Sequence, residues 1–310
     1  MVTFLITGGA GHIGSYLSSE LVKNGYNVVV LDNLSSGCIT AVDKGAIFYE
    51  GSIGDKELLK QIFKTHEIDL VFHLAISDID KHIDSSSLHK RSLMNSLTLI
   101  NEMKRAKVSK IIFSSTASIY GSSRHSSSLL ESTEPNPETV YAKCMLEIEN
   151  QITNCGLAYI IFRYFNAAGK PKIGVDSGRQ TLIPTLLHKV REKDTEFTVF
   201  GTGFETKDGS CVRDFIHVND IISAHFLGAE RLVARNVDTV INLGTGKGHS
   251  VLEVVNMVER LTNHKFSISY SRKRPGDPIE SVASFMVAYN LLGWYPTYDL
   301  EEIIQDEAGR

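Results

Sequence analysis

The sequence predicts an α/β protein whose core is a doubly wound parallel sheet, and three observations lead to that fold class. Short apolar runs alternate with helical patterns, a glycine-rich turn follows the first run, and an acidic residue ends the second run. Continuous apolar runs are typical of parallel strands that are buried on both faces, and their alternation with helices is typical of βαβ units. We therefore predict a Rossmann-type sheet accompanied by a smaller, mostly C-terminal lobe.

The first half of the chain supplies most of the predicted sheet. Strands are expected at residues 2–7, 27–32, 70–75, 110–115 and 158–166, each of them an apolar run. Helices are expected between them, at about 12–24, 55–65, 88–106 and 138–155. Right-handed crossovers then place all strands parallel, with their carboxyl ends on one edge of the sheet. The stretch 121–137, rich in Ser, Glu and Pro, is expected to be a surface loop.

The pattern changes after Asn166. A loop-like stretch is followed by an expected helix at about 181–192, while a helix at 219–232 and a strand at 239–244 would return to the sheet. We therefore predict two discontinuous domains. Residues 1–166 and 213–250 would form the sheet domain, and residues 167–212 and 251–310 would form the smaller lobe.

The composition of the chain argues against several classes of protein. The 310 residues are 42% hydrophobic and carry a net charge of −4 without a basic block, so nucleic-acid binding has little support. The apolar N-terminus reaches glycine too soon for a signal peptide or a membrane span, so a cytoplasmic protein without membrane contact is expected. No metal site is expected either, because Cys38, Cys144, Cys155 and Cys211 lack zinc-like spacing.

A dinucleotide site is predicted at the first strand–helix turn. Gly8, Gly11 and Gly14 permit a tight turn and close backbone approach, and the helix start then offers N–H groups to a pyrophosphate. Asp32 ends the second strand, where its carboxylate can bind both ribose hydroxyls and would repel a 2′-phosphate. NAD is therefore favoured over NADP as cofactor. The alternative is a structural glycine turn with a surface aspartate.

Three further stretches follow predicted strands or open a helix. They are "FSSTASIYG" at 113–121, "VYAKCMLEIE" at 140–149 and "FRYFNAAG" at 162–169. Together with "TGGAGHIG", "DNLSSG" and "DGSCVRDFIHVND", they closely resemble the extended short-chain dehydrogenase/reductases. The nearest branch looks like the UDP-glucose 4-epimerases, and the resemblance covers nearly the whole chain.

The resemblance implies a set of site residues. Tyr141 matches the acid/base tyrosine, and Thr116 matches the hydroxyl that contacts the sugar 4-OH. Further UDP-sugar contacts are implied for Asn166, Thr181, Leu182, Phe200, Arg213, Arg274 and Asp277, with Phe200 stacking on uracil and the arginines binding the diphosphate. Besides Gly8, Gly11, Gly14 and Asp32, the NAD contacts would be His12, Ile13, Asn33, Ser36, Gly37, Ser52, Ile53, Leu74, Ala75, Ser114, Tyr141 and Tyr164. Without the resemblance, each arginine would be read as a surface charge and Phe200 as a core residue.

Met145 departs from the family pattern. The family has a lysine four residues after the tyrosine, on the same helix face, where its charge helps the phenol to ionise. Lys143 projects to nearly the opposite side and cannot simply substitute for it. Met145 is counted with the catalytic candidates, although core packing is the usual role of a methionine. Other departures are Asp78 and nearby Lys81 where the family has a lysine, and Ser52, Ser92 and Ser281, the last of which would leave room for an N-acetyl group.

The expected function is NAD-dependent oxidation at C4 of a UDP-hexose, with UDP-N-acetylglucosamine favoured. Because the lysine is missing, we expect loss of water across C5–C6, which is similar to the reaction of the UDP-N-acetylglucosamine 5,6-dehydratases of tunicamycin biosynthesis. A 4-epimerase and a catalytically silent UDP-sugar-binding protein remain alternatives. The resemblance also implies a homodimer, formed through the helices at about 88–106 and 138–155.

Overall fold

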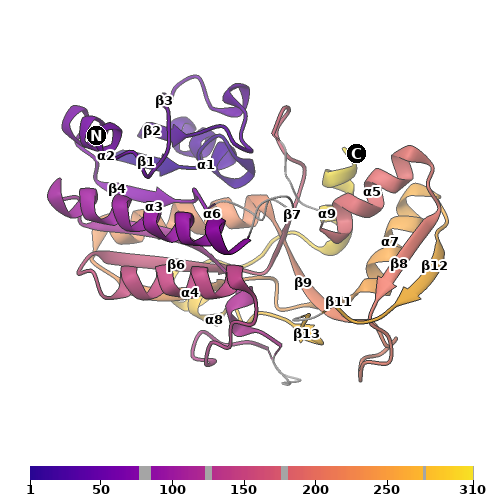
Figure 1. The fold of residues 1–310 in the computed structure, drawn as a ribbon. Helices are drawn as coiled ribbons and strands as arrows, with labels where there is room; N and C mark the ends of the chain where they lie inside the picture. Colours follow the sequence, from indigo (N-terminus) through magenta and orange to yellow (C-terminus); the bar gives the residue numbers. More distant parts are fainter. Residues whose placement is uncertain (77–84, 123–127, 176–180, 275–276, 310) are drawn as a thin grey trace.

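The apolar runs of the sequence form one parallel sheet of seven strands. In the computed structural model, which describes residues 1–76, 85–122, 128–175, 181–274 and 277–309, the strand order is β10-β6-β5-β4-β1-β2-β3 (Figure 1). The strands are β1 Thr3–Thr7, β2 Asn27–Asp32, β3 Ile47–Glu50, β4 Leu70–His73, β5 Lys110–Thr116, β6 Ala158–Tyr164 and β10 Asp238–Leu243. The order reverses beside β1, and a ligand crevice is expected outside the carboxyl ends of the strands at such a point.

Helices cover both faces of the sheet, because side chains alternate between its faces along each strand. Phe4 and Ile6 of β1 pack into a core cluster with α1 and α6, whereas Leu5 packs into a second cluster with α3 and α4. The first face carries α1 His12–Lys23, α6 Val218–Ala234 and α8 Met286–Leu292. The second face carries α2 Lys56–Thr65, α3 Ser85–Arg105 and α4 Val140–Thr153.

A smaller lobe lies beside the sheet, to its right in Figure 1. It consists of α5 Leu182–Glu192, α7 Val251–Thr262 and α9 Leu300–Ala308, with the paired strands β8 Glu196–Phe200 and β12 Ser267–Ser271, around a third apolar cluster. A second small sheet stands between the two parts. It contains β7 Asn166–Ala168, β9 Val212–His217, β11 Gly248–Ser250 and β13 Glu280–Ser281.

The predicted fold class is confirmed, and nearly every predicted strand and helix of the large sheet is present. Strand β3 was not predicted, because it lies at the edge of the sheet and is only partly buried, so it lacks a continuous apolar run. The run predicted as one strand at 158–166 ends at Tyr164, and β7 then begins in a different sheet. Two short 3-10 helices, η1 Ile39–Ala41 and η2 Ala117–Tyr120, were also not predicted.

The division into two discontinuous domains stays a prediction, and one element qualifies its boundary. Helix α8 lies in the segment assigned to the smaller lobe, yet its Ala288 and the following Trp294 pack into the core cluster of the sheet with α6. The Trp294 indole N–H donates to the Asp220 carbonyl oxygen at 2.9 Å. No helix within the described residues has the length and apolar character that crossing a membrane requires.

Candidate active site

Two positions of the turn between β1 and α1, Gly8 and Gly14, have room for glycine alone. Gly8 has a φ of +76°, and a Cβ on Gly14 would stand 2.2 Å from the Gly8 carbonyl oxygen. A Cβ on Gly8 would stand 2.9 Å from the backbone nitrogen of Ala75, which follows β4. Helix α1 starts after Gly11 without a hydrogen bond from a capping side chain. The turn therefore fits a pyrophosphate, since glycines permit close approach to its backbone and the helix start leaves N–H groups without a capping side chain.

Asp32 connects this turn to the loop that follows β2. Its Oδ2 accepts a hydrogen bond from the Ala10 backbone at 2.9 Å, and its Oδ1 accepts one from the Leu34 backbone at 2.8 Å. The carboxylate is 8% exposed and stands at the carboxyl end of β2. Its place beside the glycine turn fits the ribose of a dinucleotide and opposes a 2′-phosphate.

The other predicted cofactor contacts come from the same sheet edge. The structure places His12 and Ile13 in the first turn of α1, Asn33, Ser36 and Gly37 after β2, Ser52 and Ile53 after β3, Leu74 and Ala75 after β4, Ser114 in β5, and Tyr164 at the end of β6. Because all these strands are parallel, their carboxyl ends meet on one side of the sheet. The individual contacts remain predictions.

The three catalytic candidates belong to β5 and α4. Thr116 ends β5, and its Oγ1 accepts a hydrogen bond from the Ser118 backbone at 3.1 Å, which starts η2. Tyr141 lies in the first turn of α4, whose start Thr139 caps by accepting from the Ala142 backbone at 3.1 Å. Helices η2 and α4 pack together, so Thr116 and Tyr141 come from adjoining elements.

Met145 lies one turn after Tyr141 on α4 and is 1% exposed. It packs in the core cluster with Ile148 and Ile119. The core-packing interpretation of this methionine therefore fits its surroundings. A thioether carries no charge, so the side chain cannot itself stabilise a phenolate.

Two buried histidines beside the predicted site were missed in the sequence analysis. His225 of α6 accepts from the Tyr164 hydroxyl at 2.8 Å through Nε2, while its Nδ1 lies 2.9 Å from the Ile221 carbonyl oxygen. Tyr164 in turn lies 2.6 Å from the Ser114 Oγ. Burial lowers the pKa of His225 to about 4, so its imidazole is neutral at neutral pH. In the sequence this histidine stands within an apolar helix face, which gave no sign of its hydrogen bonds.

The second missed histidine, His73, ends β4. Its Nδ1 lies 2.9 Å from the Thr7 Oγ1, and its Nε2 lies 2.9 Å from the Ser96 Oγ of α3. Burial lowers the pKa of His73 to about 3. The imidazole therefore joins the ends of β1 and β4 to α3 as a neutral group, directly before Leu74 and Ala75.

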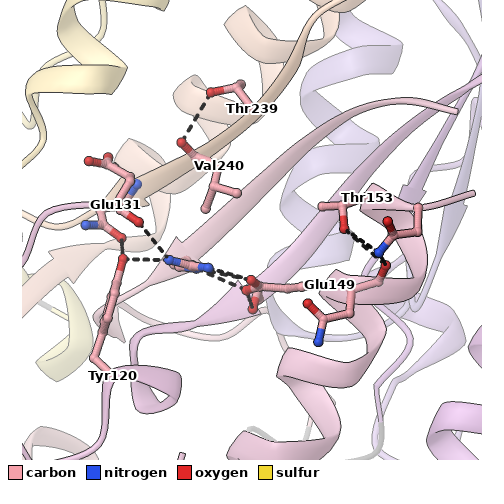
Figure 2. Close-up of polar contacts among 11 residues, drawn as sticks. Tyr120, Glu131, Glu149, Thr153, Thr239 and Val240 are labelled. Atoms are coloured by element: carbon pink, nitrogen blue, oxygen red, sulfur yellow. Dashed lines mark hydrogen bonds and ion pairs between the residues drawn. The ribbon is translucent and has the colours of Figure 1, made fainter. Parts of the chain in front are cut away.

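A buried polar network, which the sequence analysis also missed, holds α4 against β6 and η2 (Figure 2). The Arg163 Nη2 lies 2.6 Å from the Glu149 Oε2, and its Nη1 donates to the Tyr120 hydroxyl at 3.0 Å. Ser115 donates to the Glu149 Oε1, and Tyr120 donates to the Asn242 Oδ1 at 2.7 Å. Burial opposes the charge of Arg163, yet the hydrogen bond and charge of Glu149 hold its pKa above the ordinary value. Burial raises the pKa of Tyr120, so its phenol remains a donor.

Four predicted substrate residues, from the smaller lobe and from the small sheet beside it, form two pairs. The Arg213 Nη2 lies 3.7 Å from the Asp277 Oδ1, and the Arg274 guanidinium carbon lies 3.9 Å from the centre of the Phe200 ring. Phe200 ends β8 and is 37% exposed, so a large apolar ring faces solvent beside Arg274. An aromatic face and guanidinium forks are the groups that a nucleoside diphosphate requires.

The remaining predicted substrate residues start two elements of this region. Asn166 begins β7, Thr181 precedes α5, and Leu182 is the first residue of α5. Their contacts with a substrate remain predictions. The predicted departures at Asp78 and Lys81 lie outside the described residues.

The comparisons with known proteins identify the family. Residues 4–244 match the model of the NAD dependent epimerase/dehydratase family. The chain belongs to this family. It is also 37% identical to a UDP-glucose 4-epimerase of Halalkalibacterium halodurans, over 99% of this chain and 94% of that one. NAD is therefore the cofactor, as the glycine turn and Asp32 predicted.

Solved structures of family members have the same fold. A UDP-glucose-4-epimerase from Stenotrophomonas maltophila with bound NAD and formylated UDP-arabinopyranose has a TM-score of 0.92 and 29% identity, over 100% of this chain and 97% of that one. The UDP-Glc/GlcNAc 4-epimerase of Campylobacter jejuni has a TM-score of 0.86 and 30% identity, over 100% of this chain and 98% of that one. These relatives favour an epimerase. The predicted similarity to the tunicamycin-pathway dehydratases and the preference for 5,6-dehydration are therefore not supported.

All four cysteines are free thiols, two of them buried. Within the described part of the chain, no group of three or more His, Cys, Asp or Glu side chains is placed to hold a metal ion.

Proposed function

We propose that this protein is a UDP-hexose 4-epimerase. The observation that carries the proposal is the set of paired side chains at the smaller lobe and the small sheet beside it, where Arg213 with Asp277 and Arg274 with Phe200 offer binding groups for a nucleoside diphosphate. The glycine turn and Asp32 supply the second half of the site, on the sheet. The similarity to UDP-glucose 4-epimerases runs through both parts of the chain.

The proposed chemistry assigns a role to each catalytic candidate. Tyr141, as phenolate, removes the proton of the sugar 4-OH, and the Thr116 hydroxyl holds that oxygen by a hydrogen bond. NAD, which the glycine turn and Asp32 would hold, would supply the reversible hydride exchange at C4 by which a 4-keto sugar forms and is reduced on its opposite face. Tyr141 then returns its proton to the new 4-OH, so the product differs from the substrate only in the configuration at C4.

The residues around Thr116 favour epimerisation over loss of water. Elimination across C5–C6 needs a base for the C5 proton and an acid for the departing hydroxyl. The two residues after Thr116 are Ala117 and Ser118, which offer no carboxyl group there. Of the two carboxylates on the helix of Tyr141, Glu149 is 2% exposed and paired with Arg163, and Glu147 accepts a hydrogen bond from Gln151 at 2.8 Å. A 4-keto sugar formed here would therefore be reduced again.

The side chain at position 281 bears on which substituent at C2 of the sugar the site can accept. Ser281 lies in β13, is 9% exposed and pairs in register with Arg213 of β9. A small side chain beside a predicted diphosphate residue leaves space, so we propose that UDP-N-acetylhexosamines are accepted as well as UDP-hexoses. The homodimer and the cytoplasmic location stay predictions.

The test is turnover of individual sugar nucleotides. The protein is incubated with NAD and either UDP-glucose, UDP-galactose or UDP-N-acetylglucosamine, and the products are analysed by mass spectrometry and proton NMR. We expect unchanged mass and a new C4 configuration, and we expect Tyr141→Phe to remove this activity. Loss of one water with alkene signals would instead establish a dehydratase. Binding of UDP-sugars without any turnover would establish a silent binding protein.

A further inference from the structure

A chain of hydrogen bonds runs from the core of the protein to the carboxyl edge of the large sheet. His225 is fully buried, whereas Ser114 and Tyr164 are partly exposed. The His225 Nδ1 lies 2.9 Å from the Ile221 carbonyl oxygen, and its Nε2 lies 2.8 Å from the Tyr164 hydroxyl. The Tyr164 hydroxyl lies 2.6 Å from the Ser114 Oγ. The chain therefore connects an imidazole in the core with a serine of the predicted NAD site.

The chemistry of its members fixes the direction of each hydrogen bond in this chain. A carbonyl oxygen only accepts, so the His225 Nδ1 carries a proton, and burial lowers the pKa of His225 to about 4, so its Nε2 carries none. The Nε2 atom must then accept, and Tyr164 at 2.8 Å is a better donor than Ser114 at 3.5 Å. Because Tyr164 gives its only hydroxyl proton to the imidazole, its oxygen accepts the proton of Ser114. The Ser114 Oγ is left with lone pairs and no proton for a ligand.

The packing around the imidazole keeps it in this orientation. The His225 ring centre lies 4.7 Å from that of Phe162 and 6.0 Å from that of Phe72, and both phenylalanines belong to the apolar core between the sheet and α6. Half a turn of the imidazole would take both nitrogens away from their partners. Buried polar atoms without partners are costly, so the observed orientation is strongly preferred.

Ser114 lies at the part of the sheet edge where the reacting end of NAD belongs. Ser114 and Thr116 are two residues apart in β5, so their side chains share one face of the sheet, and Tyr164 of β6 stands opposite Thr116. Thr116 is the proposed contact of the sugar 4-OH, and hydride exchange at C4 requires the nicotinamide ring beside that carbon. Asp32, the predicted ribose contact, ends β2, on the far side of β4 and β1. This placement of the nicotinamide rests on the proposed function.

We infer that His225 is a positioning residue for the cofactor, which acts through Tyr164 to make the Ser114 Oγ an acceptor for the carboxamide N–H of the nicotinamide. Among the described residues, no donor is directed at this oxygen. A carboxamide has an amino group that donates and a carbonyl oxygen that accepts, so a partner that only accepts selects the amino group. His225 is buried behind Tyr164 and contacts neither cofactor nor sugar, and no proton moves along the chain.

The test is a competition between NAD and 3-acetylpyridine adenine dinucleotide, in which a methyl group replaces the carboxamide amino group. The protein is equilibrated with a mixture of known ratio, and the dinucleotides that it retains are released and quantified by mass spectrometry. The unaltered protein should prefer NAD by about tenfold, the effect of one lost hydrogen bond. His225→Phe should reduce this preference to about threefold or less, because Ser114 can then donate to the carbonyl oxygen that both dinucleotides carry.

Two further variants separate positioning from a general loss of structure. His225→Leu removes the same acceptor with a smaller apolar side chain, so it should give the same ratio and covers the case in which the phenylalanine variant fails to fold. Ser114→Ala removes the proposed acceptor itself and should also lower the preference for NAD. A merely structural role of His225 would weaken the binding of both dinucleotides alike and leave their ratio unchanged.

His66 offers a matched control, because its Nε2 lies 2.9 Å from the Tyr49 hydroxyl and neither residue belongs to the predicted site. His66→Phe should leave the preference for NAD as it is in the unaltered protein. An unchanged preference in both His225 variants would overturn the inference, and so would equal retention of the two dinucleotides by the unaltered protein. The competition needs no turnover. A protein that turns over no UDP-sugar would therefore refute the proposed function, while the ratio still decides the role of His225.

Discussion

At the scale of single residues, Gly14 shows how the cofactor turn depends on the absence of a side chain. Its missing Cβ would meet the Gly8 carbonyl oxygen at 2.2 Å and the Gly9 Cα at 2.7 Å. Both obstacles are backbone atoms of the same tight turn, so neither can rotate away as a side chain would. A Cβ on Gly11 would meet the same oxygen at 3.3 Å, which a small shift relieves. The two glycines therefore differ in how much a methyl group would disturb the site.

We predict that Gly14→Ala prevents NAD from binding and lowers the free energy of unfolding by about 1–3 kcal/mol, the usual cost of overpacking. The measurement is the thermal unfolding temperature with and without added NAD. The unaltered protein should be stabilised by NAD, because a ligand that binds only the folded state raises its stability. Gly11→Ala is the matched control and should keep part of that stabilisation. A Gly14→Ala protein that binds NAD normally would contradict the steric argument.

At the scale of elements, α4 is held in register by charge as well as by apolar packing. Glu149 follows Tyr141 by eight residues, and its carboxylate is bound by Arg163 of β6 and by Ser115, which precedes Thr116. The same few bonds therefore connect the helix of the tyrosine with the strand end that carries Thr116. Both charged groups are buried, so the loss of either would leave the other without a counter-charge.

Glu149→Gln should lower the free energy of unfolding by about 3–5 kcal/mol, because it leaves the Arg163 guanidinium buried without a counter-charge. We also expect lower kcat, since α4 and the end of β5 lose their common anchor. Urea unfolding and steady-state kinetics measure the two effects. Glu57→Gln is the control, because Glu57 forms an exposed pair with Lys60 and exposed pairs contribute little. Equal stability of the two variants would refute a structural role for the buried pair.

The elements also show what sequence patterns can predict and what they cannot. Strand β2 was predicted with its observed bounds, because a run of buried aliphatic residues and a final aspartate mark it plainly. Strand β13 has only two residues, and its sheet forms between segments that are far apart in the chain. A local sequence pattern therefore cannot predict it. In the site, the glycines and Tyr141 carry recognisable spacing. His73, His225 and Glu149 carry none, because their side-chain partners come from other elements.

At the scale of the whole molecule, the smaller lobe is fastened to the cofactor region by Lys172. Its ammonium donates to the Ser15 carbonyl oxygen at 2.8 Å, to the Ser19 Oγ at 2.6 Å and to the Ala41 carbonyl oxygen at 3.2 Å. Burial lowers the pKa of this lysine. The chain that enters the lobe is therefore bound to α1 and to the loop after β2, which both belong to the predicted NAD site. A displacement of the lobe would therefore change the position of α1 or break the hydrogen bonds of Lys172.

Acid should destabilise the whole fold through the two buried histidines. Both have a folded-state pKa far below the ordinary 6.5, about 3 for His73 and about 4 for His225. Between these values and about 6.5 the unfolded chain binds protons that the folded chain does not, so stability is full above about pH 6.5 and falls as the pH is lowered. From about pH 7 to about pH 5 each histidine should cost about 2 kcal/mol.

Urea unfolding at the two pH values measures this loss. His225→Gln should reduce the pH dependence by about half without removing it, because His73 still titrates on unfolding. Stability that does not change between pH 7 and pH 5 would show that the two imidazoles accept protons without unfolding, and so that their strand ends open locally to water.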